Sequence, residues 1–348
     1  MKPWYFILTQ TLRKRILPVN SQITRPVKRK GRTLAKRGAV LGLPLLVSCL
    51  IPWATDNPYW LHVFVLTLIY IIVSSSFRFV SISGQLPLAH AAFMGIGAYF
   101  AGMASKLLGW PPWVTIPLGA VLAALIGALT AFPFARLRSL YYALASLFLG
   151  MAIIYAIIAP REWTGGRPGL SGVPALFPDN RELFYYLCLG LTVVSLLALY
   201  RFEHSRIGVT LKAIAQSYMV AFSVGINERF YRVLAVGVGC FFAGLAGATY
   251  AHYNTVLSYT SFNLMATLWI VIYVLVGGIE SFAGPIIGTA LLIIVPEVFR
   301  ELKTFVPYVS AGILMLVVYL MPQGLVSLPR LMKSWLLKRV DAEANRGA

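Results

Sequence analysis

The chain has 348 residues, of which 59% are hydrophobic and only 12% are charged, whereas about 25% of the residues in an average soluble protein are charged. This composition excludes a soluble globular protein and indicates a polytopic membrane protein. The net charge of +19 does not indicate nucleic-acid binding, because the basic residues lie at the two ends and in short loops, as they do on the cytoplasmic side of membrane proteins.

The first 37 residues contain eleven lysines and arginines and no acidic residue. No small-residue cleavage site follows an apolar run of signal-peptide length, so we interpret 1–37 as a basic cytoplasmic segment and not as a targeting peptide. This segment is either a disordered tail that contacts lipid, with 4–8 at the headgroups, or a specific interaction arm. Residues 326–348 are predicted to form a second basic cytoplasmic tail.

Apolar stretches of about 20 residues, the length of a membrane-spanning helix, recur between the two basic segments, along 38–325. The ten candidate spans are 38–54, 59–77, 85–107, 113–134, 140–159, 183–200, 231–252, 264–279, 284–298 and 306–322. The third, eighth and ninth are short or rich in glycine, which is typical of broken or re-entrant helices. The predicted fold is therefore an all-α bundle of about ten spans, built from two related, inverted halves.

The distribution of charge predicts the orientation of these spans. Ten spans place both basic termini inside, together with 201–230, and they place the loop 160–182 outside. Nine spans would separate the termini, whereas eight would not, if two of the segments are half-spans. The external loop is rich in glycine and proline, which suits either a plain connection or a site that receives a soluble partner.

The connection 206–227 is the longest stretch in which polar residues interrupt the apolar sequence. If it is helical, four large residues fall on one face, at steps of three and four, and Gly225 can end the helix. These residues are Leu211, Ile214, Tyr218 and Phe222. We therefore predict one amphipathic helix outside the membrane, which either lies on the lipid surface or docks a cytoplasmic partner.

Two glycine-rich stretches, 84–99 and 277–290, interrupt apolar segments at corresponding places in the two halves of the chain. In transporters such interruptions mark broken helices beside the substrate path. The alternative is close helix packing through small residues. The candidate path residues are Gly84, Gln85, His90, Gly95, Gly97, Gly277, Gly278, Ser281 and Gly284.

Ionisable residues are rare inside the apolar stretches. We expect His90 to be a hydrogen-bonded packing residue, and Arg78, at the cytoplasmic end of the second span, to extend its side chain to the interface. No series of intramembrane carboxylates is present, which gives little support to a carrier coupled to protons or sodium.

The sequence predicts no catalytic residue, no cofactor-binding residue and no metal ligand. The G-x-x-x-x-G-K-[ST] motif of nucleotide-binding loops is absent, and no pair of carboxylates or Ser-His-Asp set is placed for catalysis. Cys49, Cys188 and Cys240 all lie in apolar runs and are expected to be small core residues.

Seven stretches resemble, in order and spacing, the LivM-type permease subunits of branched-chain amino acid importers of the ATP-binding cassette class. The resemblance covers about residues 60–330 and has no single decisive motif. The seven stretches are 84–99, 137–147, 164–174, 206–227, 241–253, 277–292 and 321–325.

The resemblance implies a permease subunit of a bacterial inner-membrane importer that pairs with a second, LivH-like permease. Two ATP-binding subunits, which would carry the Mg-ATP, would dock on the cytoplasmic side, and a periplasmic binding protein would deliver branched-chain or related amino acids. In this family 206–227 would be the coupling helix that fits a groove of an ATP-binding subunit. The matching coupling residues are Gly208, Lys212, Ala213, Ala221 and Gly225.

Some positions depart from the family pattern. Pro87 and Ala89 replace a small polar residue and a glycine, and no acidic residue follows Lys212 in the coupling segment. These changes concern the substrate, which could instead be an aromatic acid, or an amide such as urea. Two other interpretations are a secondary carrier or channel that acts alone, and a membrane scaffold in which the glycines only pack.

Overall fold

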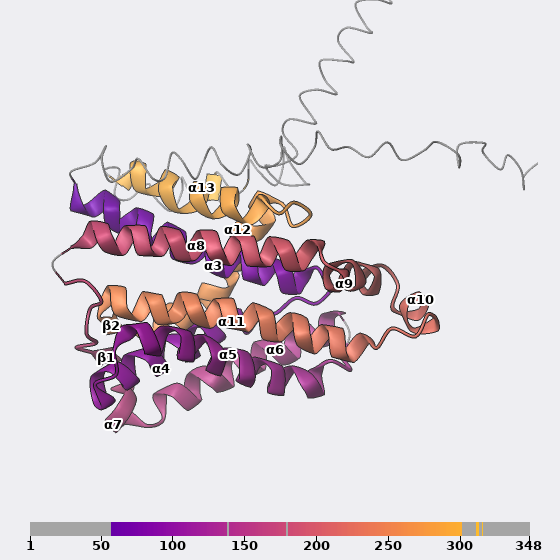
Figure 1. Cartoon of the computed structure of the whole chain (residues 1–348), viewed down its shortest axis with the longest axis horizontal. Coiled ribbons are helices and arrows are strands. Elements are labelled where there is room, and N and C mark those ends of the chain that lie inside the picture. The colour runs from indigo at the N-terminus through magenta and orange to yellow at the C-terminus, as the bar shows by residue number, and fades with distance from the viewer. Residues whose placement is uncertain (1–56, 138, 179, 301–310, 313–314, 316–348) are drawn as a thin grey trace, which may run out of the picture. The chain divides into compact units, whose positions relative to one another are not determined.

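The computed structural model describes residues 57–300, except 138 and 179, together with 311, 312 and 315. The chain divides into two units, 1–47 and 48–348, and the described residues all lie in the second. This part is mostly helical (Figure 1), which confirms the predicted all-α class. The span expected at 38–54 and the two basic terminal segments lie outside the described residues, and only 311, 312 and 315 are described of the span expected at 306–322.

Six helices of 19 to 27 residues are long and apolar enough to cross a membrane. They correspond to six of the predicted spans. They are α3 (Pro58–Ser81), α4 (His90–Leu108), α5 (Pro112–Phe134), α6 (Ser139–Ile158), α8 (Arg181–His204) and α11 (Glu228–Asn254).

Two further predicted spans form shorter apolar helices, α12 (Leu264–Gly277) and α13 (Gly284–Val298), of 14 and 15 residues. At 1.5 Å per residue each helix is about 21 to 23 Å long, whereas the hydrocarbon core of a membrane is about 30 Å thick. Each is therefore too short to cross the hydrocarbon core even without tilt, and the described residues support six full spans and two shorter apolar helices. The count of ten and the inverted halves stay predictions.

Short elements occupy the two ends of the long helices in Figure 1. α9 (Arg206–Gln216) and α10 (Tyr218–Ser223) follow the end of α8. The opposite end carries α7 (Arg161–Thr164) and the paired strands β1 (Leu170–Ser171) and β2 (Val256–Leu257), and the short helix η1 (Tyr259–Phe262) follows β2 in the chain. The two strands are antiparallel, with Leu170 opposite Leu257.

α3, α4 and α11 form the core of the described part. The most apolar 18 residues of these helices are 78%, 72% and 61% buried, compared with 39% for α5 and α8 and 28% for α6. Exposed leucine, valine and aromatic side chains cover the outer faces of α5 and α6. The core is therefore made by α3, α4 and α11, and the other long helices present apolar surface to lipid or to a partner subunit.

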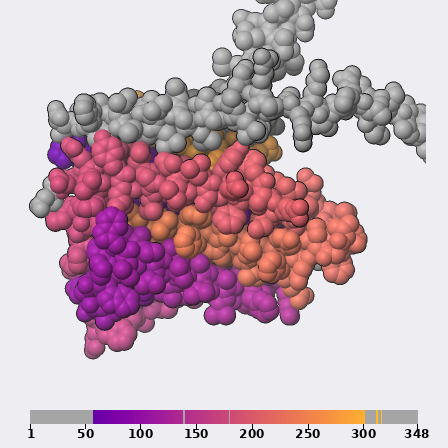
Figure 2. All heavy atoms as spheres, viewed as in Figure 1, coloured from indigo at the N-terminus to yellow at the C-terminus, as the bar shows by residue number. Residues whose placement is uncertain are grey.

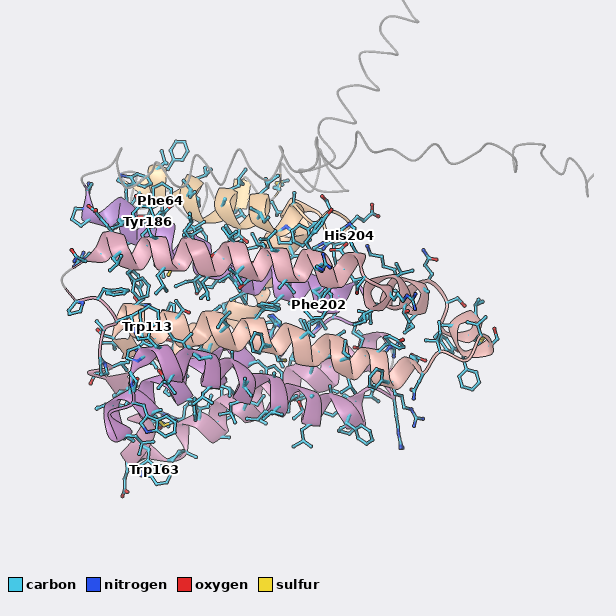
Figure 3. The ribbon with its side chains drawn as sticks, viewed as in Figure 1. Phe64, Trp113, Trp163, Tyr186, Phe202 and His204 are labelled. Carbon is cyan, nitrogen blue, oxygen red and sulfur yellow. The ribbon has the colours of Figure 1, made fainter. Side chains whose placement is uncertain are left out.

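Aromatic side chains gather at the end of the helices that carries α7. Trp113 and Trp163 are 60% and 63% exposed and, with Tyr186, lie at this end in Figure 3, whereas Phe202 and His204 lie at the other end. Exposed tryptophan and tyrosine are typical of the membrane–water interface. Both the exposed aromatic side chains and the turns at this end therefore indicate that it lies at a membrane surface.

Glycines allow α4, α5 and α11 to pack with their backbones in contact. A Cβ atom built on Gly97 of α4 would overlap the carbonyl group of Gly244 of α11, and one on Gly119 of α5 would lie 2.9 Å from the carbonyl oxygen of Gly97. Such close approach is the usual role of small residues between membrane helices.

We predict that Gly97→Ala lowers the free energy of unfolding by at least ~1–3 kcal/mol, which is the usual cost of overpacking a core. The reason is that the new methyl group would overlap a backbone carbonyl group. The measurement is the thermal unfolding midpoint of the purified protein in detergent. The matched control is Gly190→Ala in α8, where nothing lies within 4 Å of the added atom. That control should be neutral or slightly stabilising, and equal effects at the two positions would contradict the packing role.

Candidate functional site between α8 and α11

The connection between α8 and α11 forms two short helices, so the prediction of a single helix over 206–227 is wrong. α9 ends at Gln216, and the next residue, Ser217, has an extended backbone with φ −159° and ψ 107°. The Ser217 hydroxyl oxygen accepts a hydrogen bond from the backbone N–H of Val220 at 3.4 Å. A serine that caps a following helix competes with continuation of the preceding one, which explains the break.

The break separates apolar residues that the single-helix prediction placed on one face. Leu211 and Ile214 are buried in the protein, and they anchor α9 to it. Tyr218 is only half-buried, and the side chain of Phe222 is 76% exposed. The buried apolar face therefore ends with α9.

Four large apolar side chains of α10 and its C-terminal end are more than 60% exposed: Met219, Val220, Phe222 and Val224. We call these four residues the α10 surface. α10 lies beyond the end of α8 in Figure 1, and in the space-filling view of Figure 2 this region is the outermost coloured part at its end of the described residues. An exposed apolar patch on a segment that follows the spans indicates contact with a partner or with lipid.

Two of the predicted coupling residues are required by the backbone of this connection. A Cβ atom on Gly208 would overlap the backbone of Glu203, so only glycine lets α9 approach the end of α8 this closely. Gly225 has φ +80°, a conformation that residues with a side chain rarely adopt, and it turns the chain after α10. Of the two alanines, Ala213 is exposed and Ala221 is buried.

Glu203, one residue before the end of α8, binds two basic side chains from two other elements. Its Oε2 accepts a hydrogen bond from Arg78 Nη1 at 2.6 Å, and its Oε1 accepts from Arg78 Nη2 at 3.1 Å and from Lys212 Nζ at 2.8 Å. The side chains of Arg78 and Glu203 are 3% and 5% exposed, whereas that of Lys212 is 47% exposed. We call these three residues the Glu203 cluster.

Arg78 also binds the turn between α12 and α13. Its Nε donates to the carbonyl oxygen of Ile279 at 2.7 Å, and its Nη2 donates to that of Glu280 at 3.2 Å. Its guanidinium carbon lies 5.8 Å from the ring centroid of Phe282. The prediction that Arg78 extends to the interface is therefore wrong: its charge is buried and is balanced by a carboxylate and by carbonyl dipoles.

Glu203 is the residue of this site that sequence reasoning missed. It stands 125 positions after Arg78, within a polar stretch that was interpreted only as the start of a loop. The available signal was Arg78 itself, because an arginine in an apolar run needs an acidic partner when it is buried. The acidic residue next to a predicted cytoplasmic helix was the natural candidate.

The first glycine-rich stretch begins with a non-helical segment before α4. Gly84 has φ +79°, and a Cβ atom there would contact Ala215 of α9 at 3.4 Å. Gln85 is buried, and within the described residues neither polar atom of its amide has a hydrogen-bond partner. His90 Nε2 lies 2.9 Å from Ser76 Oγ, which confirms the predicted hydrogen-bonded packing role.

The other glycines of the two stretches make close contacts between elements. Gly95 lies against Phe262, and Gly97 against Gly244. Gly277 and Gly284 pack backbone to backbone where α12 meets α13, while Gly278, at φ +106°, and the half-buried Ser281 form the turn between them. Close packing, the alternative interpretation, thus accounts for these glycines in the present conformation.

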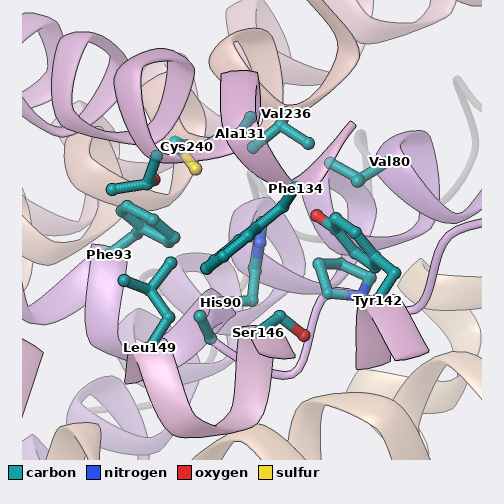
Figure 4. A pocket seen from close by; sticks show the side chains of 13 residues that line it. Val80, His90, Phe93, Ala131, Phe134, Tyr142, Ser146, Leu149, Val236 and Cys240 are labelled. Carbon is teal, nitrogen blue, oxygen red and sulfur yellow. The ribbon is translucent and has the colours of Figure 1, made fainter. Parts of the chain in front are cut away.

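The cavity beside His90, shown in Figure 4, is too small for an amino acid. Its volume is about 10 Å³, which is room for roughly one water molecule. Its walls are mostly apolar and include Phe93, Phe134, Tyr142 and Cys240. The nine candidate path residues therefore do not surround one opening beside His90.

The described residues contain no group of three or more His, Cys, Asp or Glu side chains that could hold a metal ion. Cys188 and Cys240 are free and buried, in agreement with the expected core role, while Cys49 lies outside the described residues. The buried charges of this site hold the ends of α3, α8 and α9 and the turn after α12 together.

These features define a polytopic integral membrane protein with an exposed apolar surface on α10. A family model described as "Branched-chain amino acid transport system / permease component" matches residues 59–322. The match covers more than half of the chain, so the chain belongs to this family of transport permeases.

Two similar proteins are the "High-affinity branched-chain amino acid transport system permease protein LivM" of Escherichia coli K12 and its namesake in Salmonella typhimurium LT2. Each is 28% identical over 294 residues, which cover 76% of this chain and 69% of the relative. No solved structure matches the chain. The comparisons confirm the predicted resemblance.

We predict that Arg78→Met lowers the free energy of unfolding by about 3–5 kcal/mol, the usual cost of leaving one charge of a buried pair without its partner. The double variant Arg78→Met, Glu203→Leu should be less destabilised than Arg78→Met alone, because it removes both buried charges and leaves neither without a partner. The measurement is denaturant unfolding in detergent. A double variant that loses as much stability as the sum of the two single variants would contradict the pairing.

Proposed function

We propose that this permease is one subunit of an ATP-driven importer in the inner membrane of a bacterium. The observation that carries the proposal is the α10 surface, an apolar patch outside the long helices in a chain that belongs to a permease family. The names of the similar proteins support branched-chain amino acids as the substrate class. The departures at Pro87 and Ala89 keep related amino acids, aromatic acids and amides such as urea as alternatives.

The proposed orientation puts both termini, α9 and α10 in the cytoplasm. Basic side chains at the end of α8 and the start of α11 support it, among them Arg201, Arg206 and Arg229, because positively charged loops stay inside. The loop 160–182 then lies outside. Its exposed Trp163 and its turns suit contact with a periplasmic binding protein that delivers the substrate.

The proposed partners on the cytoplasmic side are two ATP-binding subunits, which bring the Mg-ATP. α10 would enter a groove of one of them, and α9, held by Gly208 and Lys212, would carry the movement to the spans. Ala213 is exposed beside this contact, Ala221 packs α10 from within, and Gly225 lets the chain turn back. A packed segment that has two positions is a common basis of such switching.

The substrate path is proposed to lie between this chain and a second, LivH-like permease. The small cavity beside His90 supports a path that this subunit does not enclose alone. Gln85 is the strongest candidate contact, because a buried amide without partners is costly unless another molecule satisfies it. Gly84, His90, Gly95, Gly97, Gly277, Gly278, Ser281 and Gly284 would shape the path when their helices move.

A stand-alone secondary carrier is the second candidate, and the buried Arg78–Glu203 pair is the observation that favours it. Buried charge pairs are common in proton and ion pathways. In this chain the pair is fully engaged by Lys212 and by two carbonyl groups. A carrier would move its substrate without ATP hydrolysis.

We predict that Phe222→Glu releases the ATP-binding subunit while the permease still inserts in the membrane. An exposed aromatic anchor at an interface is worth about 2 kcal/mol or more, so capture should fall by about tenfold or more. The measurement is purification of the tagged permease from native membranes in mild detergent, with ATPase activity assayed on the complex.

Phe222→Leu, which keeps an apolar side chain, is the matched control and should retain most of the capture. Equal capture by wild type and Phe222→Glu would mean that the α10 surface contacts lipid. Purification of the wild type alone, with ATP-independent transport, would favour the carrier.

We predict opposite accessibility for two exposed positions at the two ends of the helices. Arg167→Cys, in the loop 160–182, should react with a membrane-impermeant thiol reagent added to spheroplasts, and it should crosslink to the binding protein. Val224→Cys should react only in inverted vesicles. The reverse pattern would overturn the proposed orientation.

A further inference from the structure

The Glu203 cluster connects the proposed docking segment to the turn between α12 and α13. We propose that Glu203 is a positioning residue that transmits a movement of α9 to this turn, and the proposal rests on the function proposed above. The route runs from Lys212 through the Glu203 carboxylate to Arg78, and from Arg78 to the carbonyl groups of Ile279 and Glu280.

The first step is the contact between α9 and the carboxylate. Lys212 is half-exposed and gives Glu203 one hydrogen bond at 2.8 Å, whereas Arg78 is buried and gives two, at 2.6 and 3.1 Å. Exposed ion pairs are weak and buried bidentate pairs are strong. The Lys212 contact can therefore break and re-form while the Arg78–Glu203 pair stays intact.

The second step is the rigid fork of Arg78. All three nitrogen atoms of its guanidinium group are engaged, with Nη1 and Nη2 on Glu203 and with Nε and Nη2 on the turn. A planar group bound on two sides cannot rotate without breaking a contact. A displacement of the Glu203 carboxylate is therefore passed on to the backbone of the turn.

The third step is the turn itself, whose geometry suits a hinge. Gly278 has φ +106°, and the backbones of Gly277 and Gly284 are in contact on either side of it. Hinges are often small residues at the ends of helices. α12 and α13 have 14 and 15 residues and are shorter than the six long helices, so a change at this turn would reposition two short elements and leave the long spans in place.

A second contact of α9 reaches the first glycine-rich stretch. Gly84 lies against Ala215, while Gly208 presses α9 onto the end of α8. α9 therefore contacts the first of the two stretches that sequence analysis related to the substrate path, and it is linked to the second one indirectly, through Glu203 and Arg78.

The test uses the complete importer in inverted membrane vesicles and the variant Lys212→Met, which removes the α9 contact and keeps the buried pair. The ATP-binding subunit should still co-purify and hydrolyse ATP. The amount of substrate released from these inverted vesicles per ATP hydrolysed should fall by about tenfold. A change of this size is within the usual range of coupling between sites. Arg206→Met, which removes another exposed cation of α9, is the matched control and should keep the wild-type ratio.

A second readout reports on the turn directly. In a Cys49→Ser background, Ser281→Cys should change its rate of thiol labelling when ATP is added, and Lys212→Met should abolish that change. Glu203→Gln should have the same effect, and the double variant should be no worse than the more severe single variant, because both substitutions interrupt one route. A role in stability alone would leave the ATP-dependent change in place.

The outcomes separate this inference from the proposed function. If the wild-type complex is ATP-driven and both Lys212→Met and Glu203→Gln keep its ratio of transport to hydrolysis, the route through Glu203 is overturned and the importer stands. If the wild type captures no ATP-binding subunit, the proposed function fails first, and this inference fails with it.

Discussion

The buried charge of Arg78 constrains much of the structure. A guanidinium group that is 3% exposed needs a carboxylate and further acceptors around it, because an unpaired charge in an apolar interior is very costly. The contact with Glu203 places the end of α8 beside the end of α3, and the contacts with Ile279 and Glu280 fix the turn after α12. Lys212 of α9 binds the same carboxylate, so the orientation of α9 also depends on the buried charge of Arg78.

Glycine packing is the second constraint, and it acts on the opposite side of the core. α4, α5 and α11 approach until backbone meets backbone, as at Gly97 and Gly244, and only about 10 Å³ is left in the cavity beside His90. Because the core is packed this closely, we expect functional contacts at the surface and at the junctions between helices. The α10 surface and the Glu203 cluster are one such surface and one such junction among the described residues.

Much of the fold could be predicted from local sequence. An apolar run must be about 20 residues long to cross a membrane as a helix, so the six long helices fall where the apolar runs do. α12 and α13 are shorter because Gly277 and Gly278 interrupt the apolar run between them, and the sequence marked this place correctly. The break at Ser217 was missed because helical periodicity continues across it, and only the structure reveals it, by the extended backbone of Ser217 and the capping hydrogen bond that its hydroxyl accepts from Val220.

The sequence by itself determined the membrane class, the places of the long helices, the family resemblance and the segment that follows α8, because these depend on composition and on short-range periodicity. Only the tertiary structure decided that Arg78 pairs with Glu203, that Gly84 touches α9, and that Gly95 and Gly97 pack between helices. The reason is that these contacts join residues far apart in the chain, as Arg78 and Glu203 are by 125 positions. Local sequence patterns do not predict which distant residue a buried charge or a glycine will contact.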